Sequence, residues 1–180
     1  MVPLLKVLRV LRPFFKRDEG SSTVEFVIIF PVFMTVMLSS VEAGVLMLRH
    51  VMLERSLDLV VRTLRLGIDP PADEVELLED VCENVMLIPD CANVLRVELT
   101  RVSTASWNVP TTGVTCVQRG EELQPLLNYT LGADHDIMLV RVCAVVDPFF
   151  PTTGLAMRLP LDDSGGYALV SSSAFVNEPS

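Results

Sequence analysis

The sequence predicts an α+β fold: a long N-terminal transmembrane and amphipathic helix, followed by a short helix packed on a small antiparallel sheet. Two observations support this. Residues 26–41 contain no charged side chain, and the apolar run continues to residue 48 with Glu42 as its only charge. Beyond residue 90, apolar and polar residues alternate instead, which is the pattern of strands buried on one face.

The apolar run is long enough to cross a membrane, because a hydrocarbon core is about 30 Å thick and needs about 20 residues. Ser21, Ser22 and Thr23 are suitable capping residues, and we expect Glu25 in the first turn, where it suits the helix dipole. Pro31 removes a backbone hydrogen bond and predicts a kink. If the span begins near residue 24, Glu42 lies about 27 Å further along the axis, near the outer interface.

The same helix is predicted to continue to about residue 66, with Gly67 ending it. Beyond the span its apolar residues recur at helical spacing, at Leu53, Leu57, Val60, Val61 and Leu64. We therefore divide the chain into a basic leader (1–20), a transmembrane helix (21–48), an amphipathic extension (49–68) and an extracytoplasmic α+β domain (69–180).

The charge distribution predicts the orientation of the span. The leader holds five cations and two acids, a net charge of +3. The whole chain has a net charge of −9, so residues 21–180 carry −12. Positive residues stay on the cytoplasmic side of a membrane, which places the N-terminus inside and the acidic body outside. Because nucleic-acid phosphates are bound by Lys and Arg, this body also argues against a nucleic acid as partner.

The outer part reads as one short helix and several strands. Residues 70–87 predict an acidic amphipathic helix, whose inner face is formed by Val75, Leu77, Leu78, Val81 and Val85. Strands are predicted at residues 93–103, 114–118, 136–146 and 166–176. The third is apolar on both faces, so we expect it to be the central strand.

All four cysteines lie in this outer part, and an even number in an exported region favours disulfides. One pairing joins Cys82 to Cys91, from the end of the short helix to the segment after it, and Cys116 to Cys143, between two strands. The other connectivities stay open, as do free thiols packed in the core.

The sequence does not predict an enzyme. Asp134, His135 and Asp136 are adjacent, but one His between two acids, with no second ligand cluster, is far more often solvated than metal-bound. No catalytic residue, metal, cofactor or small-molecule substrate is therefore expected.

The stretch around the membrane boundary resembles the processing site of type IV prepilins. Its features are a basic leader, then Gly20, then Glu25 five residues later, then an apolar run. More narrowly, "GSSTVEFVIIFPVFM" looks like the TadE-like minor pilins, or pseudopilins, of the Flp/Tad type IVb pilus. The final "AFVNEPS" also resembles the end of many such proteins. The likeness covers the first fifty residues well and the tail weakly.

This resemblance implies that a prepilin peptidase cuts after Gly20, so that the mature chain starts at Ser21. Glu25 would then neutralise the terminal amine of a neighbouring subunit, with Phe26 and Pro31 in the same assembly contact. A simpler interpretation of Glu25 is an interfacial acid at a helix N-terminus that needs no partner. Secretion with a signal-peptidase cut near residues 41–43 is a further alternative, against which the long apolar run argues.

The function implied is that of a minor pilin or pseudopilin in Flp/Tad pilus assembly. The expected partners are the bacterial inner membrane, prepilin peptidase, other pilin or pseudopilin subunits and Tad assembly proteins. The expected location is a single-pass protein with a periplasmic head, in the fibre or at its base. The alternative is an uncleaved, signal-anchored envelope protein whose outer domain binds a ligand or partner.

Overall fold

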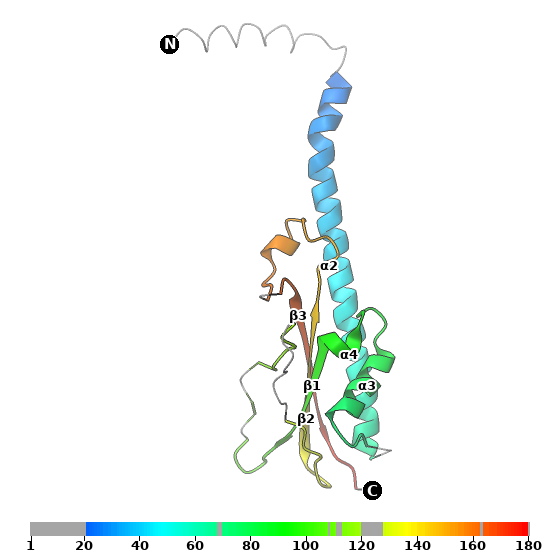
Figure 1. Cartoon of the computed structure of the whole chain (residues 1–180), viewed down its shortest axis with the longest axis vertical. Helices are drawn as coiled ribbons and strands as arrows, with labels where there is room; N and C mark the ends of the chain where they lie inside the picture. The colour runs from blue at the N-terminus through cyan, green and yellow to red at the C-terminus, as the bar shows by residue number, and fades with distance from the viewer. Residues whose placement is uncertain are drawn as a thin grey trace.

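The computed structural model describes residues 21–67, 70–107, 109–110, 113–119, 128–162 and 164–179. The leader, with Gly20, lies outside the described residues. The elements are α2 (Ser21–Leu66), α3 (Glu74–Asn84), α4 (Cys91–Val94), β1 (Leu95–Val102), β2 (Ile137–Val146), η2 (Ala156–Arg158) and β3 (Tyr167–Val176). We call the elements after α2 the head. Figure 1 shows the first half of α2 standing clear of the head and the second half lying along it. The predicted α+β fold is confirmed.

Helix α2 runs for 46 residues and continues through Pro31 as a single element. It ends where predicted, since Gly67 adopts a positive φ of 62° and its N–H donates to the Leu64 carbonyl at 3.2 Å. That left-handed conformation is accessible to glycine at little cost. One expectation is wrong: the first turn holds no acidic residue, so Glu25 lies just beyond it.

The three strands form one antiparallel sheet in the order β1-β2-β3, which confirms the third predicted strand as the central one. Residues 114–118 are not a strand, contrary to the sequence prediction. This segment is held by Cys116, whose disulfide partner Cys143 lies on the central strand, so it is attached to the sheet through a side chain and not through backbone pairing.

The core lies between one face of the sheet and the second half of α2, with α3 beside them. The five apolar residues predicted for this part of α2 are all buried there. In α3, Leu77 and Val81 are buried, but Val75 is 60% exposed, so its assignment to the inner face is wrong. Helix geometry explains this, because a turn of about 100° per residue puts Val75 about 200° around the axis from Leu77, on the side away from the core.

Two disulfides join the pairs favoured from the sequence. Cys82–Cys91 links the end of α3 to α4, across a separation of 9 residues. Cys116–Cys143 spans 27 residues. Only one end of this second bridge lies on a strand, so the expectation that it joins two strands is wrong.

The opposite face of the sheet carries a buried ion pair. Glu98 of β1 stands opposite Arg141 of β2 in the register, and Nη2 of the arginine lies 2.6 Å from Oε2 of the glutamate. Their side chains are only 8% and 11% exposed. A paired, hydrogen-bonded charge is the form in which an ionised group is tolerated in an interior.

Candidate assembly surface

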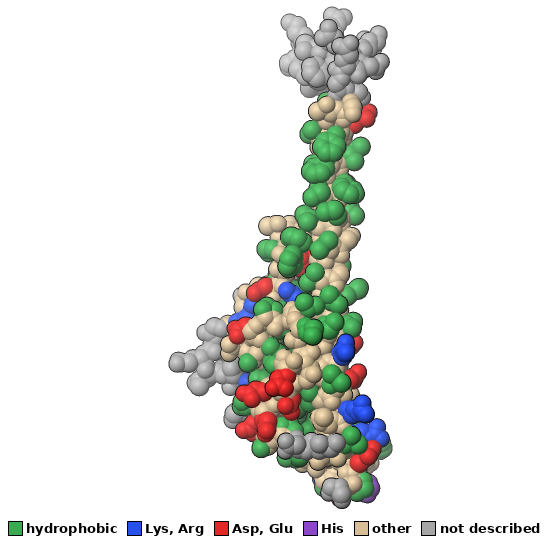
Figure 2. All heavy atoms as spheres, turned by 90° about the vertical axis from the view of Figure 1, so that its right-hand side faces the viewer, with side chains coloured by type: hydrophobic (Ala, Val, Ile, Leu, Met, Phe, Trp, Pro, Cys, Tyr) green, Lys and Arg blue, Asp and Glu red, His purple; other side chains and the backbone are tan. Residues whose placement is uncertain are grey.

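The first half of α2 is apolar and exposed on all sides. Ile28 is 65% and Phe33 is 58% exposed, values that are unusual for such large apolar side chains. Figure 2 shows hydrophobic side chains along this narrow half, while the charged ones gather over the head. Within the part of the chain that the structure describes, one helix, Ser22–Leu66, is long and apolar enough to cross a membrane. Its most apolar window has a mean hydropathy of 2.1 and no buried residue.

The polar residues of this half bond within the helix itself. The Thr35 hydroxyl donates to the Pro31 carbonyl at 2.5 Å, and the Ser40 hydroxyl donates to the Val36 carbonyl at 2.9 Å. Such internal bonds satisfy a hydroxyl where no water is available. The surface that α2 offers to its surroundings is therefore almost wholly apolar.

The predicted assembly residues Glu25, Phe26 and Pro31 all lie on this exposed half. The Phe26 ring stacks on that of Phe30, with centroids 5.0 Å apart. Ser21 is the first residue of α2, and its side chain is outside the described part. The structure thus places Glu25 at the start of the apolar surface, one residue before Phe26.

The apolar surface ends at Glu42, which is fully buried. Its carboxylate accepts two backbone hydrogen bonds from the loop after β2: Oε1 from the Phe149 N–H at 2.9 Å, and Oε2 from the Phe150 N–H at 2.6 Å. We call residues 147–161 the junction loop. Sequence reasoning placed Glu42 at the membrane interface and missed these partners. The available signal was the charge itself, since a lone acid in an apolar run needs donors when it is buried.

A second contact fixes the base of the junction loop. Nη1 of Arg49 donates to the Asp147 carbonyl at 2.8 Å and to the Tyr167 hydroxyl at 3.2 Å. Burial raises the pKa of the Tyr167 phenol, and the hydrogen bond from Arg49 opposes this rise only in part. Because Glu42 and Arg49 are seven residues, or about two turns, apart on α2, the loop is held along one face of the helix.

An apolar groove of about 380 Å³ continues the exposed surface onto the head. It lies between α2 and the start of β3, and its apolar lining residues are Leu46, Met47, Val51, Ala168, Leu169 and Val170. His50 also lines it, with Nε2 at 3.3 Å from Oε1 of Glu54. The groove begins four residues after Glu42, so a helix packed along α2 would meet apolar surface on both parts of the molecule.

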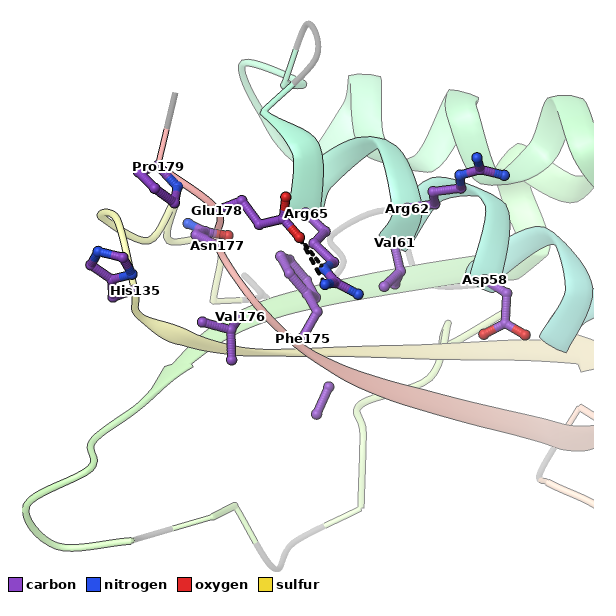
Figure 3. A pocket seen from close by; sticks show the side chains of 11 residues that line it. Asp58, Val61, Arg62, Arg65, His135, Phe175, Val176, Asn177, Glu178 and Pro179 are labelled. Atoms are coloured by element: carbon purple, nitrogen blue, oxygen red, sulfur yellow. Dashed lines mark hydrogen bonds and ion pairs between the residues drawn. The ribbon is translucent and has the colours of Figure 1, made fainter.

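A larger groove, of about 680 Å³, lies at the opposite end of the head, between the end of α2 and the C-terminal tail (Figure 3). Arg65 and Glu178 form an ion pair across it, with Nη2 and Oε1 at 2.7 Å, and Arg62 and His135 also line it. The neighbouring Asp136 pairs instead with Arg101 at 2.8 Å. Among the described residues, no three His, Cys, Asp or Glu side chains gather in a metal-binding arrangement.

Comparison with known proteins concerns the exposed apolar half of α2. Residues 20–60 match the model of a family described as TadE-like protein. This chain carries a TadE-like domain. The match begins at the predicted cut and runs through the apolar half of α2 and Glu42. It ends within the half of α2 that packs on the sheet, where Leu53 and Leu57 are buried. No curated protein and no solved structure matches the chain.

The TadE-like match and the apolar helix fit a membrane-anchored protein related to the Tad pilus. The matched segment contains the exposed apolar half of α2. It also contains Glu42, whose carboxylate binds the junction loop of the head. The TadE-like match thus covers most of α2, and the elements of the head follow it in the chain.

Proposed function

We propose that this protein is a minor pilin, or pseudopilin, that takes part in Flp/Tad pilus assembly. It is anchored in the inner membrane with its head in the periplasm and is cut by prepilin peptidase after Gly20. The observation that supports this best is the exposed and almost wholly apolar first half of α2, which continues into a half that packs on a folded head. A helix of this kind is stable only in lipid or against other apolar helices.

In this proposal Glu25 is the assembly contact. A carboxylate at the edge of a hydrocarbon phase is costly unless a positive group lies near it. Cleavage after Gly20 removes the leader's five cations and creates an α-amino group at Ser21. The amine of one subunit and Glu25 of the next then form a pair in a low-dielectric environment, where their attraction is strong. Phe26 and Pro31 pack beside this pair.

The first test is N-terminal sequencing of the protein from membranes of cells with and without the peptidase. We expect Ser21 as the first residue when the peptidase is present and an intact leader when it is absent. Replacing Gly20 by Leu should block the cut, because its side chain would occupy the tight site around the scissile bond. Gly113→Leu is the matched control, since a Cβ atom at Gly113 meets no atom of the described residues within 4 Å. A mature chain that starts after residue 43 would contradict the proposal.

The second test compares Glu25→Ala with Glu54→Ala in cells that assemble pili. Both remove an exposed acid from α2, but only Glu25 lies at the start of the apolar half. We expect pili to be lost in the first variant and kept in the second. Normal piliation in the Glu25 variant would remove the assembly role assigned to this residue.

The larger groove favours a second candidate function, that of an uncleaved anchored protein whose head binds a partner. It lies at the end of α2 away from the exposed half of the helix (Figure 1), and Arg62 and Arg65 line it beside the acids Asp58 and Glu178, so that it offers charges of both signs to a polar partner in the periplasm. Loss of a bound partner in an Arg62→Ala variant, together with an intact leader, would favour this candidate over the pilin.

A further inference from the structure

We propose that the junction loop is a second membrane contact, lying in the outer interface of the bilayer that α2 spans. This inference rests on the membrane anchoring in the proposed function and adds the outer leaflet as a lipid partner of the head. It assigns to the head a fixed position on the membrane surface.

The depth of the loop follows from its hydrogen bonds. A span that begins near residue 24 brings Glu42 about 27 Å along the axis, close to the outer edge of a hydrocarbon core of about 30 Å. The amides of Phe149 and Phe150 lie within 2.9 Å of the Glu42 carboxylate. The loop is therefore at the depth of the outer interface whenever α2 spans the membrane.

The composition of the loop suits that depth. Residues 148–157, "PFFPTTGLAM", contain no charged side chain and are flanked by Asp147 and Arg158. Phe149 is 57% and Met157 is 68% exposed, although both are large and apolar. Figure 1 shows η2 and the loop before it at the end of the head nearest the bare half of α2. Exposed apolar side chains beside a membrane-spanning helix extend the lipid-facing surface that the helix begins.

The loop is also held in shape, so its exposed side chains project from a fixed frame. The Thr153 N–H donates to the Phe150 carbonyl at 3.1 Å, and the Thr153 hydroxyl accepts the Ala156 N–H at 3.3 Å. The Met157 N–H then donates to the Thr153 carbonyl at 3.1 Å. Because these bonds order the backbone in advance, insertion of Phe149 and Met157 costs little further conformational entropy.

Three charged residues, Arg49, Arg119 and Asp147, lie together at the base of the loop, on the side away from the exposed half of α2. Arg119 donates to Asp147 at 2.7 Å and to the Ser164 hydroxyl at 2.7 Å, and Arg49 holds the Asp147 carbonyl about two turns beyond Glu42. The loop is thus apolar at the Glu42 level and polar at its base, which is the polarity of an interfacial segment.

The test places single tryptophans in the full chain in phospholipid vesicles that contain a lipid with a quencher near its headgroup. The chain has one tryptophan, Trp107, which is replaced by Phe as the background. The reporters are Phe149→Trp and Met157→Trp, so that a fault in one variant leaves the other informative. Phe33→Trp, in the span, reports anchoring in a second set of vesicles whose quencher lies deep in the acyl chain, because residue 33 is about 14 Å from residue 24 and so near the bilayer centre. Leu66→Trp is the matched negative control, since Leu66 is 43% exposed and lies about 36 Å beyond Glu42 along the helix.

We expect the quencher to reduce the emission of both loop reporters by about twofold or more, and to leave the Leu66→Trp variant unchanged. Quenching of the Phe33→Trp variant alone would overturn the inference while leaving the anchor intact. If the Phe33→Trp variant is also unquenched, the anchor itself fails, and both the inference and the proposed function fall.

Discussion

Glu42 of α2 accepts the backbone N–H of Phe150 at 2.6 Å, a contact between residues 108 positions apart in the chain. The carboxylate is fully buried and holds the neighbouring Phe149 N–H as well. A charge at this position would otherwise be costly, and two loop amides would lack an acceptor. These two hydrogen bonds therefore fix the junction loop on α2 at the point where the exposed half of the helix ends.

Replacing Glu42 by Ala should weaken the attachment of the junction loop to α2. Each amide left without an acceptor costs about 1–3 kcal/mol, so we expect hydrogen exchange at Phe149 and Phe150 to accelerate by about tenfold or more. Glu42→Gln keeps one carbonyl oxygen as acceptor and should give an intermediate rate. The measurement is hydrogen exchange by mass spectrometry on the full chain in a membrane mimetic.

Glu54→Ala is the control for this prediction, because Glu54 is an acid on the same helix whose side chain is 53% exposed. It should leave the exchange of the junction loop unchanged. Equal protection of the loop in the Glu42→Ala variant and in the wild type would show that Glu42 does not hold the junction loop on α2.

The buried pair on the sheet gives a second prediction. Arg141→Met leaves the Glu98 carboxylate buried without this partner, and we expect the free energy of unfolding to fall by about 3–5 kcal/mol. The double variant Glu98→Leu, Arg141→Met should recover most of this loss, since an apolar pair of similar volume has no charge to desolvate. Denaturant titrations of the three proteins give the comparison, and a double variant no more stable than the single one would refute the explanation.

The two disulfides should differ in their contribution to stability. In the chain-entropy model the stabilisation grows with the logarithm of the closed loop, so the bridge spanning 27 residues exceeds the one spanning 9 by about 1 kcal/mol. We expect the Cys116→Ala, Cys143→Ala variant to be the less stable of the two paired variants. Unfolding titrations under oxidising conditions test this, and the reverse order would rule out loop entropy as the dominant cause.

A fourth prediction concerns alkaline pH. Burial, with the nearby charges of Asp73, Glu76 and Asp80, raises the pKa of Tyr129 from its ordinary value of 10 to about 12. Its hydroxyl donates to the Pro71 carbonyl, and this bond requires the neutral phenol. Because the pKa is higher in the folded state, the stabilisation is complete below pH 10 and is lost as the pH rises through 12.

Absorbance titration of the phenolate checks this value, with Tyr129→Phe identifying the signal. The Tyr129→Phe variant should also lose less stability than the wild type between pH 10 and pH 12. A midpoint near pH 10 for Tyr129 in the folded protein would contradict the expected burial of its phenol.

Local patterns predicted the elements that depend on local chemistry. The apolar run and its helical continuation predicted the extent of α2, alternation predicted β1, and a run that is apolar on both faces predicted β2 as the central strand. The strand prediction for residues 114–118 failed because a short apolar stretch does not show which strand it would pair with. In the structure a disulfide to the central strand holds this segment, without backbone pairing. The inner-face prediction for Val75 failed because this residue lies about 200° around the helix axis from Leu77, outside the arc that faces the core.

What the sequence by itself determined is the long apolar helix: its length, the acid at its start and its resemblance to TadE-like proteins. Those properties depend on composition and spacing along one segment. Only the tertiary structure decided that Glu42 joins the helix to the head, because its partners are backbone amides more than a hundred residues away and every residue except proline carries such an amide. The same hydrogen bonds bring the junction loop, with Phe149, to the end of the exposed half of α2, which the local sequence of the loop could not specify.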